Sequence, residues 1–208
     1  IATLNVVRDG FVLSTEADLM NHTSRLISSI AQELRGTSYH MVMMPFFPDE
    51  DAMVPIRYLV ETGSADGIIL NQTTPDDPRV HYMAAHNIPF ATHGRTETGI
   101  EHPYFDYDNE AFARLAVQAL VERGRRQLLL IAPPRAQCYA GHMIAGFEAA
   151  AMAHGLSAEV LASSNSDAGA IAIEAAMAER MVRSPVPDGI ICGSTTAAMA
   201  AVTGAELC

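Results

Sequence analysis

Short, continuous apolar runs recur along the chain, separated by longer stretches whose apolar residues return every three or four positions. Continuous runs indicate buried strands, and the wider spacing indicates helices with one buried face. We predict strands at 1–7, 39–44, 67–70, 88–92, 128–132, 159–162 and 189–192. We predict helices at 16–34 and 53–62, from Asp76 or Asp77 onward, from Asp108 or Asn109 to Gly124, at 139–154 and 167–182, and after Cys192. This alternation predicts an α/β fold with parallel sheets covered by helices on both faces.

The stretch from His102 to Pro134 shows the pattern most clearly. Asp108 or Asn109 is suited to cap a helix, and Gly124 is suited to end it. The spacing of the apolar residues predicts one buried stripe, made of Phe112, Leu115, Ala116, Ala119 and Leu120. The uninterrupted run at 128–132 predicts a central strand that is covered on both faces.

Charge and cysteine content limit the possible partners. The chain has 208 residues and a formal net charge of -11, with only Arg125-Arg126 as a basic run. It is therefore a poor candidate for binding DNA itself, because DNA is bound through clustered positive charge. Its cysteines are odd in number and widely spaced, which favours a reducing compartment. The sequence shows no signal peptide and no apolar run of roughly 20 residues, so we expect a cytoplasmic protein without a membrane partner.

Three segments together resemble the lactose-repressor-like (LacI/GalR) transcription factors. The segments are DYDNEAFARLAVQALVERGRRQLLLIAPP from Asp106, ADGIILN at 65–71 and PDGIIC at 187–192. The resemblance implies a periplasmic-binding-protein-like type I fold, in which two Rossmann-like lobes close on a small molecule. We expect an N-terminal lobe at 1–107 and a C-terminal lobe at 108–208. The family's helix-turn-helix is expected before Ile1, and the last part of its second lobe beyond Cys208.

In the first lobe the resemblance implies ligand contacts at strand ends. Asn71 follows the third strand, and its amide both donates and accepts, which suits sugar hydroxyls. Arg95, in THGR, follows the fourth strand and is suited to bind hydroxyls or a carboxylate. Tyr107 stands at the crossover between lobes, where an aromatic face suits a sugar ring. The plainer alternatives are a turn cap for Asn71, an ion pair with Glu97 or Glu101 for Arg95, and hinge packing for Tyr107.

Other candidate contacts are less closely aligned with the family. Asn5 and Phe11 belong to the first strand end and its loop. In the second lobe, Met143 stands where the family's R-x-x-G-[FY] pattern has an arginine, so His142 is a candidate replacement. Ser194 opens a Ser-Thr pair in the place of the family's usual N-D or S-D. These departures weaken the expectation of a simple monosaccharide ligand.

The function we predict is effector sensing for a LacI-type regulator, with a sugar or sugar derivative as effector. We expect a homodimer that meets operator DNA only through the upstream helix-turn-helix. The alternative is a sugar-binding protein of an ABC transporter. A thiol enzyme built on Cys138 and His142, four residues apart, is a third hypothesis. We predict no enzymatic activity, no catalytic residues and no cofactor, and P-loop and G-x-G-x-x-G motifs are lacking. We also predict no metal site, because His81 and His86 are five residues apart and miss the i, i+4 spacing of helical ligands.

Overall fold

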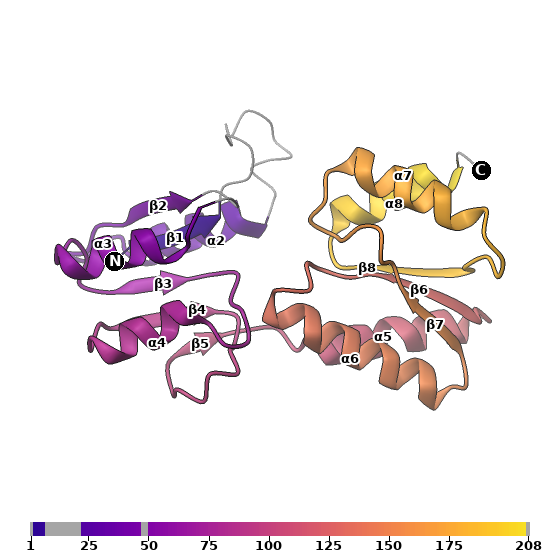
Figure 1. Ribbon diagram of the computed structural model, residues 1–208, viewed down its shortest axis with the longest axis horizontal. Helices are drawn as coiled ribbons and strands as arrows, with labels where there is room; N and C mark the ends of the chain where they lie inside the picture. The colour runs from indigo at the N-terminus through magenta and orange to yellow at the C-terminus, as the bar shows by residue number, and fades with distance from the viewer. Residues whose placement is uncertain (1, 7–21, 47–49, 207–208) are drawn as a thin grey trace. The chain divides into compact units, whose positions relative to one another are not determined.

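The computed structural model describes residues 2–6, 22–46 and 50–206, which form two compact units. The first unit is Ile1–Asp106 and the second is Tyr107–Cys208. We predicted a lobe boundary after residue 107, and the division lies one residue earlier. Each unit is a parallel sheet with helices packed against it (Figure 1).

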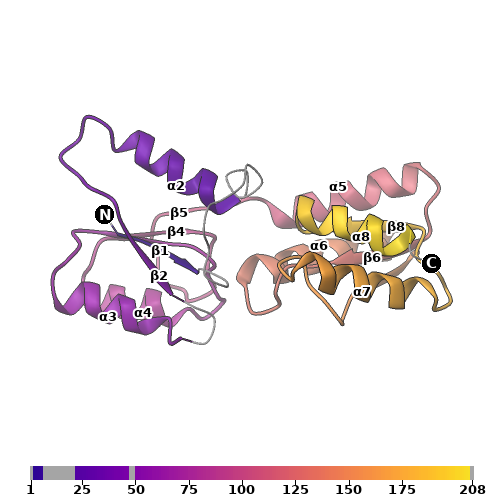
Figure 2. The same ribbon diagram turned by 90° about the horizontal axis from the view of Figure 1, so that it is seen from above.

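The first unit contains a parallel sheet in the strand order β2-β1-β3-β4-β5. Its strands are β1 (Ala2–Val6), β2 (Val42–Phe46), β3 (Ile68–Leu70), β4 (Phe90–His93) and β5 (Tyr104–Phe105). The helices described here are α2 (His22–Glu33), α3 (Met53–Glu61) and α4 (Pro78–Ala85). α3 and α4 lie on one face of the sheet and α2 on the other (Figure 2). The core under α3 and α4 comprises Ile56, Leu59, Ile68, Leu70, Val80 and Met83.

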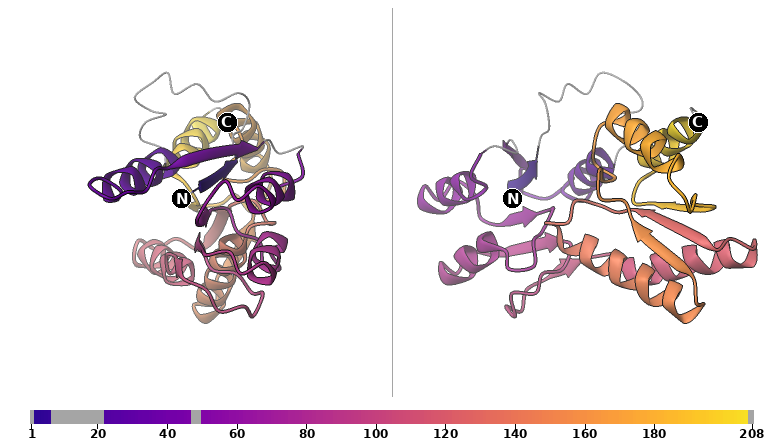
Figure 3. Two further views of the ribbon diagram at one scale, coloured as in Figure 1. Left: turned by 90° about the vertical axis from the view of Figure 1, so that its left-hand side faces the viewer. Right: turned by 45° about the vertical axis from the view of Figure 1, so that its right-hand side comes forward.

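The second unit contains a parallel sheet in the order β7-β6-β8. Its strands are β6 (Gln127–Ile131), β7 (Ser157–Val160) and β8 (Gly189–Cys192). Its helices are α5 (Asn109–Glu122), α6 (Cys138–Ala153), α7 (Ala170–Met181) and α8 (Thr195–Glu206). α5 and α6 cover one face, and α7 and α8 cover the other (Figure 3).

The central strand β6 is buried on both faces, as its apolar run predicted. Leu128 and Leu130 pack with Phe147 in the core beneath α5 and α6. Leu129 and Ile131 pack on the opposite side, beneath α7 and α8. Successive side chains of a strand point to opposite faces, so a strand between two helix layers is apolar at every position.

The predicted buried stripe of α5 is wrong in part. Phe112 and Leu115 are 44% and 60% exposed, whereas Ala113 and Val117 are fully buried. The reason lies in α6, where a Cβ added at Gly146 would be 2.6 Å from the carbonyl oxygen of Glu110. So close an approach of two helices admits only small side chains between them, and α5 therefore turns its small residues inward.

Strand boundaries differ most from prediction at the sheet edges. β2 was expected at 39–44 and β7 at 159–162, but backbone pairing places them at 42–46 and 157–160. The short edge strand β5 was not predicted, and both of its residues are more than half exposed. Edge strands bury less apolar surface, so their apolar pattern is weak. Within the described parts of the chain, no helix is long and apolar enough to cross a membrane.

Candidate ligand-binding edges of the two sheets

Asn71 follows β3 and opens the loop that leads to α4. Open parallel sheets bind ligands at the carboxyl ends of their strands, and this loop lies at that edge. The Asn71 residue is only 5% exposed. Its backbone carbonyl accepts a hydrogen bond of 3.3 Å from Nη2 of Arg79. The predicted contact residue is thus part of a loop whose backbone is held by an arginine that the sequence did not single out.

Arg79 forms a buried ion pair with Asp77, at the start of α4. The two residues are 4% and 0% exposed. Nε donates to Oδ1 at 2.9 Å and Nη2 donates to Oδ2 at 2.7 Å. The same Nη2 also donates to the carbonyl of Gln72 at 3.1 Å. A forked guanidinium is suited to this double pairing, and the carbonyl bonds extend it to the ligand loop.

Asp77 has a second role as the N-cap of α4, and it is one of the two residues, Asp76 or Asp77, that the sequence predicted at this helix start. Its side chain accepts from the backbone N–H of Arg79, and Pro78 occupies the first turn. Burial is the largest single influence on the carboxyl and opposes its charged form. The hydrogen bonds and charge of Arg79, with the N–H of Thr74, together outweigh burial and hold the pKa of Asp77 below its ordinary value.

Thr73 joins the loop after β3 to the loop after β4. Its hydroxyl donates to the carbonyl of Arg95 at 3.0 Å. A Cβ added at Gly94 would lie 2.7 Å from the Thr73 hydroxyl oxygen, and Gly94 has φ of +106°. Both the space and the backbone conformation therefore require glycine in THGR. This contact brings the Asn71 and Arg95 loops together at one edge of the first sheet.

Arg95 pairs with a carboxylate that the sequence analysis missed. Its Nε donates to Oδ2 of Asp106 at 2.9 Å, where the Arg95 side chain is 36% exposed and that of Asp106 is 10% exposed. The pair orients the guanidinium beside a shallow pocket of about 320 Å³. The pocket is lined by Arg95, Thr96, Gly99, Ile100, Glu101, His102 and Tyr104. Asp106 lies 11 positions from Arg95, so no local pattern could indicate their pairing.

Tyr107 is the first residue of the second unit. The residue is 57% exposed, and its carbonyl accepts a hydrogen bond of 3.0 Å from the Asn109 side chain. Asp108 caps α5 by accepting from the backbone N–H of Ala111 at 2.8 Å. The predicted cap is confirmed, and a ligand contact of Tyr107 stays a prediction.

The first-strand candidates lie largely outside the described residues. The backbone of Asn5 pairs in register with Pro45 of β2, which places Asn5 near the carboxyl end of β1. The side chain of Asn5 and the whole of Phe11 are outside the described residues. Their ligand contacts stay predictions.

In the second unit, Ser194 lies at the carboxyl edge of the sheet and stabilises the start of α8. Its hydroxyl donates to the carbonyl of Ser166 at 3.1 Å and accepts from the N–H of Ala197 at 3.1 Å. Met143, at the position of the family's arginine, is 4% exposed and belongs to the core. The Ser194 hydroxyl at this edge therefore already caps α8. Met143 contributes to the core beneath α5 and α6.

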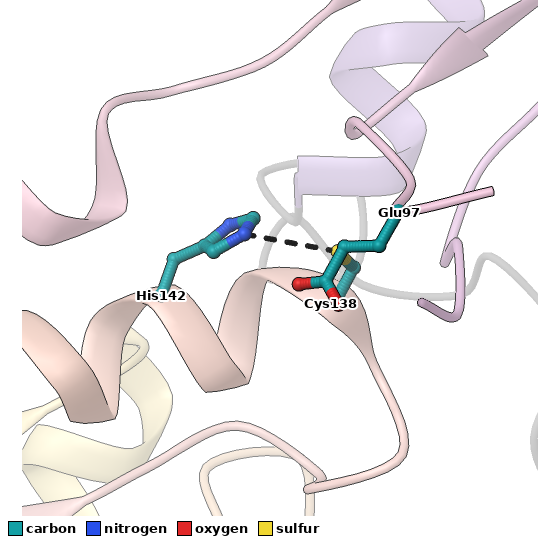
Figure 4. A group of neighbouring side chains, drawn as sticks. All are labelled: Glu97, Cys138 and His142. Atoms are coloured by element: carbon teal, nitrogen blue, oxygen red, sulfur yellow. Dashed lines mark hydrogen bonds between the residues drawn. The ribbon is translucent and has the colours of Figure 1, made fainter. Parts of the chain in front are cut away.

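Cys138 and His142 face each other on the first turns of α6 (Figure 4). The distance from Sγ to Nε2 is 3.9 Å, and Cys138 is 2% exposed. A thiol so little exposed is poorly placed to attack a substrate, which gives the thiol-enzyme hypothesis no support. Burial also raises the pKa of Cys192, to about 11, so its reactive thiolate is scarce at neutral pH.

Comparisons with known proteins identify the family to which this chain belongs. The family described as periplasmic binding proteins and sugar binding domain of LacI family matches residues 19–207. The HTH-type transcriptional regulator AglR of Rhizobium meliloti is 26% identical over 214 residues, which is 97% of this chain and 57% of that protein. The chain therefore spans little more than half the length of this curated relative.

Solved structures show the same fold. A regulatory protein of the LacI family from Chloroflexus aggregans aligns with a TM-score of 0.77 and 22% identity, over 99% of this chain and 73% of that one. The transcriptional regulator CelR in complex with cellobiose aligns with a TM-score of 0.73 and 22% identity, over 99% of this chain and 62% of that one. The chain belongs to the family of periplasmic binding proteins and LacI-type sugar-binding domains.

Proposed function

We propose that this chain is the effector-sensing domain of a LacI-type transcriptional regulator and has no enzymatic activity of its own. The observation that carries the proposal is the family match over residues 19–207, which includes every strand of the two parallel sheets except β1. The relative that covers 97% of the chain is named a transcriptional regulator, which supports regulation over transport. The net charge of -11 favours DNA contact through a helix-turn-helix outside this chain.

We propose a sugar or sugar derivative as the effector. The relevant support is the cellobiose complex of the similar protein CelR, together with the side chains at the first sheet's edge. Arg95 carries five N–H donors, of which the Nε–H donates to Asp106. The guanidinium of Arg95, which Asp106 orients, is suited to donate to hydroxyl oxygens. The side-chain amide of Asn71 can both donate and accept hydrogen bonds. A purely apolar ligand would desolvate the Arg95–Asp106 ion pair without offering it a hydrogen bond, which is costly.

The function is that of a switch, which imposes a thermodynamic condition. The effector must bind the DNA-competent and DNA-incompetent states with different affinity, because equal affinity shifts no population. Such a regulator works where DNA is, so we place the protein in the cytoplasm.

The experiment is a thermal-shift screen of neutral mono-, di- and trisaccharides, cellobiose among them, followed by titration calorimetry on the hits. A ligand at 100 times its Kd adds about 2.7 kcal/mol of stability, which the screen detects readily. We expect Arg95→Ala and Tyr107→Ala each to weaken binding by about tenfold or more, because the ligand groups they contact lose their partners. Arg183→Ala is the matched control, since Arg183 is exposed and its guanidinium bonds Glu179, one helical turn earlier.

The proposal fails in its site assignment if both variants bind the sugar as tightly as the control. It fails in its ligand class if no saccharide shifts the wild-type melting temperature while charged or apolar metabolites do.

A further inference from the structure

Gln72 has a backbone conformation that its residue type rarely adopts. Among the described residues, only Gln72 and Asn87 have positive φ without being glycine, at 51° and 53°. In this left-handed region Cβ crowds the following carbonyl oxygen. Residues held there persist only when their surroundings impose the conformation, and they concentrate at functional sites.

The second of these residues, Asn87, has an ordinary structural explanation. It follows the C-terminal residue of α4 and its cap His86, where helices commonly end in a left-handed residue. Its N–H donates to the carbonyl of Ala84 at 3.1 Å. Asparagine also tolerates this region better than most residues do.

No such explanation applies to Gln72, which ends no helix. It lies two residues beyond β3, between Asn71 and Thr73, at the carboxyl edge of the first sheet. The buried Arg79 side chain fixes the backbone of Gln72, because it donates hydrogen bonds to the carbonyls of both Asn71 and Gln72. Arg79 is itself fixed by Asp77 at 2.9 and 2.7 Å. A buried ion pair thus holds the strained residue in place.

Exposure distinguishes the two neighbouring amides of this loop. Asn71 is buried, with 5% of its surface exposed, whereas Gln72 is half-buried. A half-buried side chain is reachable by a small molecule and is partly desolvated already. Its amide offers two N–H donors and a carbonyl acceptor, which complement hydroxyl groups because a hydroxyl also donates and accepts.

We propose that Gln72 is a ligand-contacting, specificity-determining residue, and that the Asp77–Arg79 pair holds its left-handed backbone to direct the amide at a neutral polyol such as an oligosaccharide. The inference deepens the proposed function and rests on it. Arg79 acts through Gln72 and is a positioning residue. Its two carbonyl bonds connect the buried charge pair to the loop that carries the candidate contacts.

The experiment compares two matched glycine variants of the intact chain. Gln72→Gly and Asn87→Gly both place glycine at a left-handed position, so neither strains the backbone and both should keep a melting temperature close to that of the wild type. Gln72→Asn is the conservative variant, since asparagine tolerates the conformation and keeps a shorter amide. Binding is measured by calorimetry with neutral di- and trisaccharides, cellobiose first, alongside Arg95→Ala.

We expect Gln72→Gly to lose at least tenfold in affinity, Gln72→Asn to lose less, and Asn87→Gly to stay within about twofold of wild type. A folded Gln72→Gly that binds as tightly as Asn87→Gly overturns the inference, and the proposed function then stands if Arg95→Ala has weakened binding. A wild-type chain that binds no saccharide overturns both this inference and the proposed sugar effector. If Gln72→Gly fails to fold, Gln72→Asn decides: unchanged affinity rejects the contact, and weakened affinity with an unchanged melting temperature supports it.

Discussion

At the scale of single residues, the buried Asp77–Arg79 pair connects the start of α4 to the loop after β3. We predict that Arg79→Met destabilises the protein by about 3–5 kcal/mol at neutral pH, because it leaves the buried carboxylate of Asp77 without its partner. The double variant Asp77→Asn with Arg79→Met removes both charges and should recover much of that loss. Urea denaturation measures both, and equal stability of the two variants would contradict the prediction.

The same pair gives an acid dependence whose sign can be worked out. The pKa of Asp77 is lowered in the folded state, so its stabilisation is present above the unfolded pKa of about 3.9 and is lost as pH falls through the folded value. In Arg79→Met, burial without a partner should raise that pKa. The variant should then become less stable as pH rises from about 4 to 7, whereas the Asp77 contribution in the wild type does not fall over that range. A parallel dependence in both proteins would refute this account.

At the scale of elements, α5 and α6 approach each other at Gly146. We predict that Gly146→Ala destabilises the second unit by about 1–3 kcal/mol, because its Cβ would meet the Glu110 backbone and push the helices apart. Gly141 lies on the same helix, and a Cβ added there would have nothing within 4 Å. Gly141→Ala should therefore stabilise by about 0.5–1 kcal/mol, from helix propensity alone. Thermal unfolding measures both changes, and a shared sign would disprove the packing argument.

At the scale of the whole molecule, we predict that the intact regulator is a homodimer that uses α3. Val54 and Tyr58 lie one turn apart on this helix and are 59% and 53% exposed. Regulators that bind two DNA half-sites are commonly two-fold symmetric, which suits a self-complementary patch. Light scattering should show that Val54→Glu with Tyr58→Glu weakens the dimer. The control is Met152→Glu on α6, which is 80% exposed in the second unit. A monomeric wild type at high micromolar concentration would rule the prediction out.

The amino-acid sequence by itself determined the order and type of most elements. The run at 128–132 predicted a doubly covered strand, and Leu128 to Ile131 do pack alternately into two cores. The sequence predicted a helix start at Asp76 or Asp77 and a cap at Asp108 or Asn109. The structure shows Asp77 and Asp108 as the caps, each accepting an N–H bond from the first turn of its helix. These features depend on residues close in sequence, so a local pattern is sufficient to reveal them.

Only the tertiary structure decided which face of α5 is buried and which residues hold the ligand loops. Apolar size favoured Phe112 and Leu115, but the close approach to Gly146 selected Ala113 and Val117. Likewise, Asp106 pairs with Arg95 across a loop, and Arg79 reaches back to the carbonyls of Asn71 and Gln72. The buried face of α5 and the partners of these two arginines depend on residues that are distant in the sequence but close in space. Those spatial neighbours decide whether a charged or bulky side chain is buried or exposed.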